Sequence, residues 1–122
     1  MIIGITGTTS GIGKSILGLP YEFVTFDRND GDIEQPDVVF EKLKDCDVFI
    51  NNAWHNDCQT KLLNFFFERW REYDKKIISI GSSVATYSPS GSGYNDYVEL
   101  KRQLRSAHCD IVNLKTTACK SY

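Results

Sequence analysis

A glycine-rich turn follows the first β-branched run of the chain, and this junction constrains the fold more than any other feature. The sequence indicates a strand over residues 1–6 and a short helix over residues 12–18. Glycines at a strand-to-helix turn allow a tight reversal, and they let a pyrophosphate approach backbone N–H groups at the helix N-terminus. The junction therefore predicts an α/β fold whose first turn can bind phosphate groups.

Short apolar strands and helical patterns alternate along the rest of the chain. The expected strands are residues 1–6, 21–26, 47–51, 77–80 and 111–114, and the expected helices are residues 12–18, 36–44, 57–73 and 94–107. This alternation is typical of a doubly wound parallel sheet. We expect one domain over residues 1–122, with a Rossmann-like α/β sheet of about six strands.

Composition narrows the class of protein. A chain of 122 residues that is 41% hydrophobic and 25% charged is typical of one globular domain. The net charge of −2 argues against nucleic acid as the main ligand. The longest apolar runs are far shorter than the roughly 20 residues that a membrane span needs, and the N-terminus lacks a signal-peptide pattern. We expect a cytoplasmic protein, and the scattered Cys and His residues predict no metal site.

The turn and the end of the second strand carry the first set of candidate binding residues. In the turn they are Gly7, Thr9, Ser10, Gly11, Ile12 and Gly13. Asp27 stands twenty residues after Gly7, where a carboxylate can bind ribose hydroxyls and repel a 2′-phosphate. This favours NAD, although the neighbouring Arg28 can accommodate a 2′-phosphate and leaves NADP open.

The same stretch allows a second interpretation. Gly13, Lys14 and Ser15 match the end of a P-loop, in which the lysine binds phosphates and the serine binds magnesium. A P-loop has four residues between its first glycine and the Gly-Lys pair, whereas Gly7 and Gly13 enclose five. A P-loop phosphotransferase is therefore the less favoured alternative.

Tyr97 and Lys101 form a second constellation, because a spacing of four places them on one face of the expected helix. An ammonium near a phenol favours the phenolate, so Tyr97 can exchange a proton near neutral pH. Ser82 and Ser83 follow the expected strand 77–80, and the carboxyl ends of parallel strands face the crevice where ligands bind.

These patterns together resemble the short-chain dehydrogenases/reductases. The matches are the turn from Thr6 to Gly13, Asn51-Asn52-Ala53, the strand-end Ser83, and the pair Tyr97 and Lys101. The resemblance implies hydride transfer between a nicotinamide and a small carbonyl or alcohol substrate. It also implies that Asn52, Ala53, Asp32 and Ile33 bind the cofactor.

The resemblance assigns a role to each catalytic candidate. Tyr97 donates the proton to the carbonyl oxygen, and Ser83 holds that oxygen, with Ser82 as the alternative. Lys101 binds the nicotinamide ribose and favours the phenolate of Tyr97. Asn56 supports a water in the proton relay, or else it caps the following helix.

The chain also departs from the family. Trp54 stands where the family has a glycine, and Thr116 and Thr117 follow the expected last strand where the family has a Pro-Gly turn. Members of the family are much longer, and we expect the segment that closes over the substrate to be absent. The alternative function is therefore a catalytically silent nucleotide-binding or scaffold protein.

The expected helix 57–73 has an unusually wide apolar surface. Its apolar residues are Leu62, Leu63, Phe65, Phe66, Phe67, Trp70 and Tyr73. They cover an arc of roughly 200°, about twice what a helix on one sheet needs. This predicts either a partner subunit or a deeply covered core helix. In the family this helix and the tyrosine-bearing one pack in dimers, so we expect a dimer or tetramer through helices 57–73 and 94–107.

Overall fold

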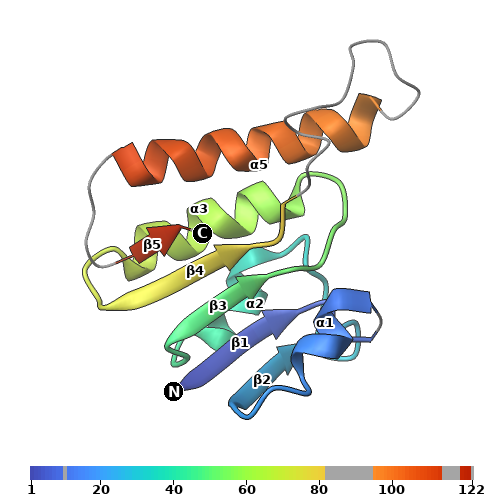
Figure 1. Cartoon of the computed structure of the whole chain (residues 1–122), viewed down its shortest axis with the longest axis vertical. Coiled ribbons are helices and arrows are strands. Elements are labelled where there is room, and N and C mark those ends of the chain that lie inside the picture. Colours follow the sequence, from blue (N-terminus) through green and yellow to red (C-terminus); the bar gives the residue numbers. More distant parts are fainter. Residues whose placement is uncertain (10, 82–94, 114–118, 122) are drawn as a thin grey trace.

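The computed structural model describes residues 1–9, 11–81, 95–113 and 119–121. Strands β1 (Ile2–Thr6), β2 (Glu22–Phe26), β3 (Val48–Asn51), β4 (Lys75–Ser79) and β5 (Cys119–Ser121) alternate with helices α1 (Gly11–Ile16), α2 (Pro36–Leu43), α3 (Cys58–Trp70) and α5 (Asn95–Asn113) (Figure 1). The described strands form one parallel sheet in the order β2-β1-β3-β4-β5. The predicted Rossmann-like α/β fold is confirmed.

The register of the sheet brings the ends of four strands to one edge. Thr6 at the end of β1 pairs with Phe26 of β2, and Asn51 at the end of β3 pairs with Ser79 of β4. In Figure 1 these strands all point toward the same side of the molecule. In parallel sheets the crevice beyond this edge is where ligands bind.

The two faces of the sheet bury separate apolar clusters, because successive strand residues point to opposite faces. Phe49 and Ile77 pack on one face against Leu43 of α2 and Phe66 of α3, and the rings of Phe49 and Phe66 stack at 4.0 Å. The other face holds Ile3, Ile5, Val48 and Ile50, with Ile16 of α1 packed against them. The stable core thus lies directly under the strand ends.

Helix α3 is covered from several sides, because it packs on β3 and β4 and contacts both α2 and α5. The buried members of its apolar arc are Leu62, Leu63, Phe66, Phe67 and Trp70. Phe40 of α2 packs edge-on against Phe66 at 5.1 Å. Tyr73 lies beyond the end of the helix and is 59% exposed. The wide arc is therefore used mostly inside the chain, as in a covered core helix.

One expected strand is wrong. Residues 111–113, expected as part of a last strand, belong to α5, and the last described strand is β5. The buried positions Val98, Lys101, Leu104 and His108 recur every three or four residues, which is the spacing of one helix face. The described residues thus hold five strands where about six were expected. Within the same ranges, no helix is both long and apolar enough to cross a bilayer.

Candidate functional site

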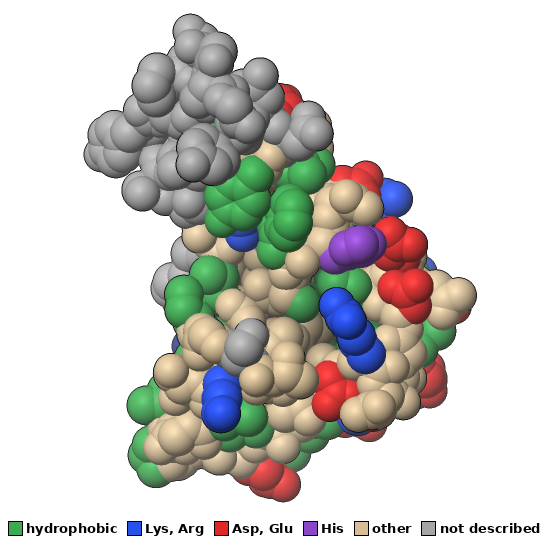
Figure 2. All heavy atoms as spheres, turned by 90° about the vertical axis from the view of Figure 1, so that its right-hand side faces the viewer, with side chains coloured by type: hydrophobic (Ala, Val, Ile, Leu, Met, Phe, Trp, Pro, Cys, Tyr) green, Lys and Arg blue, Asp and Glu red, His purple; other side chains and the backbone are tan. Residues whose placement is uncertain are grey.

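A cleft of about 990 Å³ lies at the carboxyl edge of the sheet. Its lining comes from the segments after β1, β2 and β3: Gly7, Thr8, Thr9, Phe26, Asp27, Arg28, Asn29, Gly31, Asp32, Ile33, Asn52, Ala53, Trp54 and His55. Figure 2 shows this hollowed face, with hydrophobic side chains beside basic, acidic and histidine side chains. The cleft brings together the predicted cofactor residues Gly7, Thr9, Asp27, Arg28, Asp32, Ile33, Asn52 and Ala53.

The turn after β1 is closed by contacts that admit only glycine. Gly7 has a φ of +73°, and a Cβ added to Gly13 would lie 2.0 Å from the carbonyl oxygen of Gly7. The side-chain amide of Asn52 donates to the carbonyl oxygens of Gly7 at 2.9 Å and of Thr6 at 3.2 Å. The turn is therefore fixed to the end of β3, and its glycines let these backbone segments pack closely.

The other predicted turn residues lie elsewhere. Gly11 and Ile12 line a separate shallow depression on α1, together with Ser15, Ile16 and Leu19. Gly13 packs inside the turn against Gly7. Ser10 lies outside the described residues.

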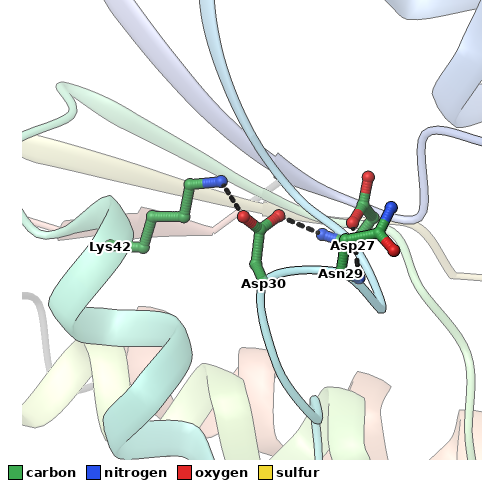
Figure 3. A network of polar contacts seen from close by, with 4 residues as sticks. All are labelled: Asp27, Asn29, Asp30 and Lys42. Carbon is green, nitrogen blue, oxygen red and sulfur yellow. Dashed lines mark hydrogen bonds and ion pairs between the residues drawn. The ribbon is translucent and has the colours of Figure 1, made fainter.

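Asp27 is held at the end of β2 by a short polar network (Figure 3). Its Oδ1 accepts a hydrogen bond from the backbone N–H of Asn29 at 2.8 Å, and its own N–H donates to Asp30 Oδ2 at 2.9 Å. Lys42 of α2 binds Asp30 Oδ1 at 2.6 Å. The Lys42 hydrogen bond, followed by the Asp27 N–H, lowers the pKa of Asp30 below its ordinary value. The turn is thereby tied to α2 and keeps Asp27 in the cleft.

His55 and Glu34 connect the segments after β3 and β2. His55 Nε2 lies 3.0 Å from Glu34 Oε1, and both side chains are about half exposed. Asn56 has a φ of 49°, and its side-chain nitrogen lies 3.4 Å from His55 Nε2. Helix α3 begins after Asp57 without a side-chain cap, so Asn56 does not cap it.

Lys101 is buried at the site, with only 4% of its surface exposed. Its Nζ donates to Gln59 Oε1 at 2.6 Å and to the carbonyl oxygen of Ile80 at 2.9 Å. Burial lowers the pKa of Lys101, because removing an ammonium from water disfavours the charged form. Among the described residues, Gln59 is the side chain that accepts a hydrogen bond from Lys101.

Gln59 was missed in the sequence, although it joins several elements at the site. Its amide nitrogen donates to the carbonyl oxygens of Asn51 at 2.9 Å and Ile80 at 3.1 Å. Asn51 in turn donates to the carbonyl oxygen of Gln59 at 2.7 Å and to Ser79 Oγ at 3.2 Å. The available signal was its spacing, three and four residues before Leu62 and Leu63 on the buried face of α3.

Tyr97 completes the described part of the site. Its half-buried ring lies 5.2 Å from the ring of Trp54, and Lys101 Nζ lies 5.6 Å from the ring centre. Trp54 lines the cleft, so the predicted pair of Tyr97 and Lys101 lies next to one end of it. Ser82, Ser83, Thr116 and Thr117 lie outside the described residues.

Solved structures of known proteins match this fold over nearly the whole chain. A short-chain dehydrogenase from Streptomyces avermitilis superposes with a TM-score of 0.75 over 98% of this chain and 63% of its own, at 17% identity. The chain has the short-chain dehydrogenase fold. Serine dehydrogenase from Escherichia coli matches with a TM-score of 0.65 over 99% of this chain and 79% of its own, at 18% identity.

A cofactor complex has the same fold. The NADH-dependent reductase A1-R′ complexed with NAD matches with a TM-score of 0.71 over 98% of this chain and 75% of its own, at 18% identity. No family model matches the sequence, and no curated protein matches it significantly. The similarity to short-chain dehydrogenases is therefore one of fold, and the chemistry has to be argued from this chain's own residues.

Proposed function

We propose that this chain is an NAD(P)-dependent oxidoreductase of the short-chain dehydrogenase type. It transfers hydride between a nicotinamide and a carbonyl or alcohol. One observation carries the proposal: a single cleft holds the glycine turn, Asp27 and the Asn52-Ala53 segment, and Tyr97 and Lys101 lie next to that cleft. These are the groups that nucleotide binding and proton transfer require.

The residues present fit a dinucleotide. Gly7, Thr8 and Thr9 of the turn line the cleft, and a glycine turn at a helix N-terminus suits a close approach of pyrophosphate to the backbone. Asp27 offers a carboxylate in the cleft for ribose hydroxyls. It favours NAD, whereas Arg28 in the same lining offers a cation for a 2′-phosphate. We therefore propose NAD as the preferred cofactor.

In the proposed reaction the nicotinamide supplies or accepts the hydride when it is bound. Tyr97 donates a proton to the substrate oxygen during reduction and takes it back during oxidation. Lys101 has three N–H groups, of which Gln59 and the carbonyl of Ile80 use two. The third is available in the proposal for a ribose hydroxyl. Ser83 is proposed to hold the substrate oxygen.

The test of catalysis uses absorbance at 340 nm. Purified protein is assayed with NADH and NADPH against a panel of aldehydes and ketones, and with NAD⁺ against alcohols. Tyr97→Phe keeps the ring beside Trp54 but removes the hydroxyl, so it should bind NADH normally and lose at least about a hundredfold in turnover. Equal turnover by wild type and Tyr97→Phe would contradict the role of Tyr97. Tyr73→Phe, at an exposed position outside the cleft, is the matched control.

The test of cofactor choice uses calorimetry. Asp27→Ala should weaken NADH binding more than NADPH binding, because it removes a ribose contact and also a charge that repels a 2′-phosphate. Equal losses for the two cofactors would contradict the proposed contact.

The burial of Lys101 favours a second candidate function. Protein groups occupy two of its donors, and the side chain is only 4% exposed. A protein that binds the nucleotide without turning over a substrate would tolerate this arrangement. Tight NADH binding with no turnover across the panel would select this second candidate.

A further inference from the structure

Trp54 is the one broad aromatic surface that the described lining presents to the cleft. Three aromatic rings line the cleft: Phe26 is 1% exposed, Trp54 is 45% exposed, and the smaller imidazole of His55 is about half exposed. The largest exposed ring at the cleft is therefore the indole. A planar ligand ring that enters the cleft beside Trp54 can pack against it.

The backbone just before Trp54 is firmly anchored. The N–H groups of Asn52 and Ala53 donate to Thr6 Oγ1 at 3.2 Å and 3.1 Å. The side chain of Asn52 adds the bond to the carbonyl oxygen of Gly7 at 2.9 Å. The segment that carries the indole is thus held by the turn after β1, which also lines the cleft.

The indole also lies beside the residue proposed to move the proton. The rings of Trp54 and Tyr97 are 5.2 Å apart and inclined at 56°. In carbonyl reduction the hydride goes to the carbon and the proton to the attached oxygen. The hydride donor must therefore lie within a few ångströms of the proton donor. A nicotinamide that transfers hydride to a substrate protonated by Tyr97 must therefore lie close to Trp54.

We propose that the indole of Trp54 packs against the nicotinamide ring and favours its oxidised form. The inference rests on the function proposed above. The oxidised ring carries a positive charge and the reduced ring is neutral, and the face of an indole attracts a cation. The ammonium of Lys101, 5.6 Å from the ring centre of Tyr97, opposes a cation. Lys101 is the same in wild type and in Trp54 variants, so a comparison of their affinities isolates the contribution of the indole.

The experiment measures affinities of the full chain for three ligands by calorimetry. NAD⁺ carries the charged ring, NADH carries the neutral ring, and ADP-ribose lacks the nicotinamide. Trp54→Leu should weaken NAD⁺ binding about fivefold, weaken NADH binding less, and leave ADP-ribose binding unchanged. Trp54→Phe, which keeps an aromatic face, should lie between wild type and Trp54→Leu. Tyr73→Leu removes an aromatic side chain that is 59% exposed and outside the cleft, so it should leave all three affinities unchanged.

A spectroscopic readout checks contact independently of affinity. The chain has two tryptophans, and Trp70 is buried with 2% exposure. Saturating NAD⁺ should quench the indole fluorescence of wild type, and Trp54→Phe should lose that quenching. Equal loss of NAD⁺ and ADP-ribose affinity in Trp54→Leu would overturn the inference while leaving the proposed function intact. A wild type that binds none of the three ligands would overturn both.

Discussion

Gln59 is the side chain that joins α3 and α5 to the ends of β3 and β4. It accepts from Lys101 at 2.6 Å and donates to the carbonyl oxygens of Asn51 and Ile80. It is 3% exposed, so none of these bonds can be replaced easily by water. Its role at the proposed site is to position Lys101.

Replacing Gln59 should therefore destabilise the protein. Gln59→Ala leaves Lys101 with one protein acceptor and leaves two strand-end carbonyl oxygens with fewer donors. We expect the free energy of unfolding to fall by about 2 kcal/mol in urea titrations. Gln59→Ala should also weaken NADH binding, measured by calorimetry, because Lys101 loses its anchor.

Two other variants separate this role from simple loss of a polar group. Gln59→Glu retains an acceptor for Lys101 and should recover part of the NADH affinity. Gln103→Ala removes an exposed glutamine from the same helix as Lys101 and should change neither quantity. If Gln103→Ala and Gln59→Ala behaved alike, the proposed anchoring would be wrong.

Residue by residue, the sequence predicted positions that belong to a motif better than side-chain contacts between distant parts of the chain. Gly7 could be found because a glycine turn has a local pattern, and Asn52 through the resemblance of Asn51-Asn52-Ala53 to a family motif. The contact between Gln59 and Lys101 joins positions 42 residues apart, and no local pattern records it. Asn56, expected to support a water in the proton relay, lies beside His55, and the amide that contacts Lys101 belongs to Gln59.

Helix α5 carries a buried histidine whose protonation opposes folding. His108 is 8% exposed, and neither of its ring nitrogens has a partner among the described residues. Burial lowers the pKa of His108 from 6.5 to about 4. The neutral imidazole therefore packs in the fold, while the imidazolium is favoured in the unfolded chain.

The stability of the protein should fall as the pH falls from about 6.5 to about 4. In this window the unfolded chain binds a proton that the folded chain does not, so the free energy of unfolding rises with pH. The linked free energy is about 3 kcal/mol across the window. His108→Leu should flatten this part of the profile, measured by urea unfolding at several pH values. His55→Gln, at a half-exposed histidine, is the control and should keep the slope.

At the scale of elements, the sequence predicted where helices and strands lie better than where they end. Helix α2 begins at Pro36, in agreement with the expected helix 36–44, because proline suits a first helical turn. The strand expected at 111–114 failed because a short apolar run has no period that separates strand from helix. The buried Leu104 and His108, four residues apart on α5, give the helical pattern that precedes this run.

At the scale of the whole molecule, the order of strands places the cleft and the tyrosine at one edge of the sheet. Alternating strands and helices were enough to predict this, since parallel strands require crossovers that return each strand to the same starting side. The homo-oligomer expected from the sequence remains a proposal. Helix α3 has little exposed apolar surface for contact with a second subunit, because most of the apolar arc of α3 is buried inside the chain.

Ligand-linked stability tests the proposed cofactor on the whole molecule without any substrate. A ligand that binds only the folded state raises the free energy of unfolding by RT ln(1 + [L]/Kd). With NADH at 100 times its Kd we expect about 2.7 kcal/mol, which raises the midpoint of thermal unfolding by roughly 10 °C. Magnesium and ATP should leave the midpoint unchanged. A rise with magnesium-ATP but not with NADH would instead favour phosphate binding of the P-loop type, because Lys14 and Ser15 follow the same glycine turn.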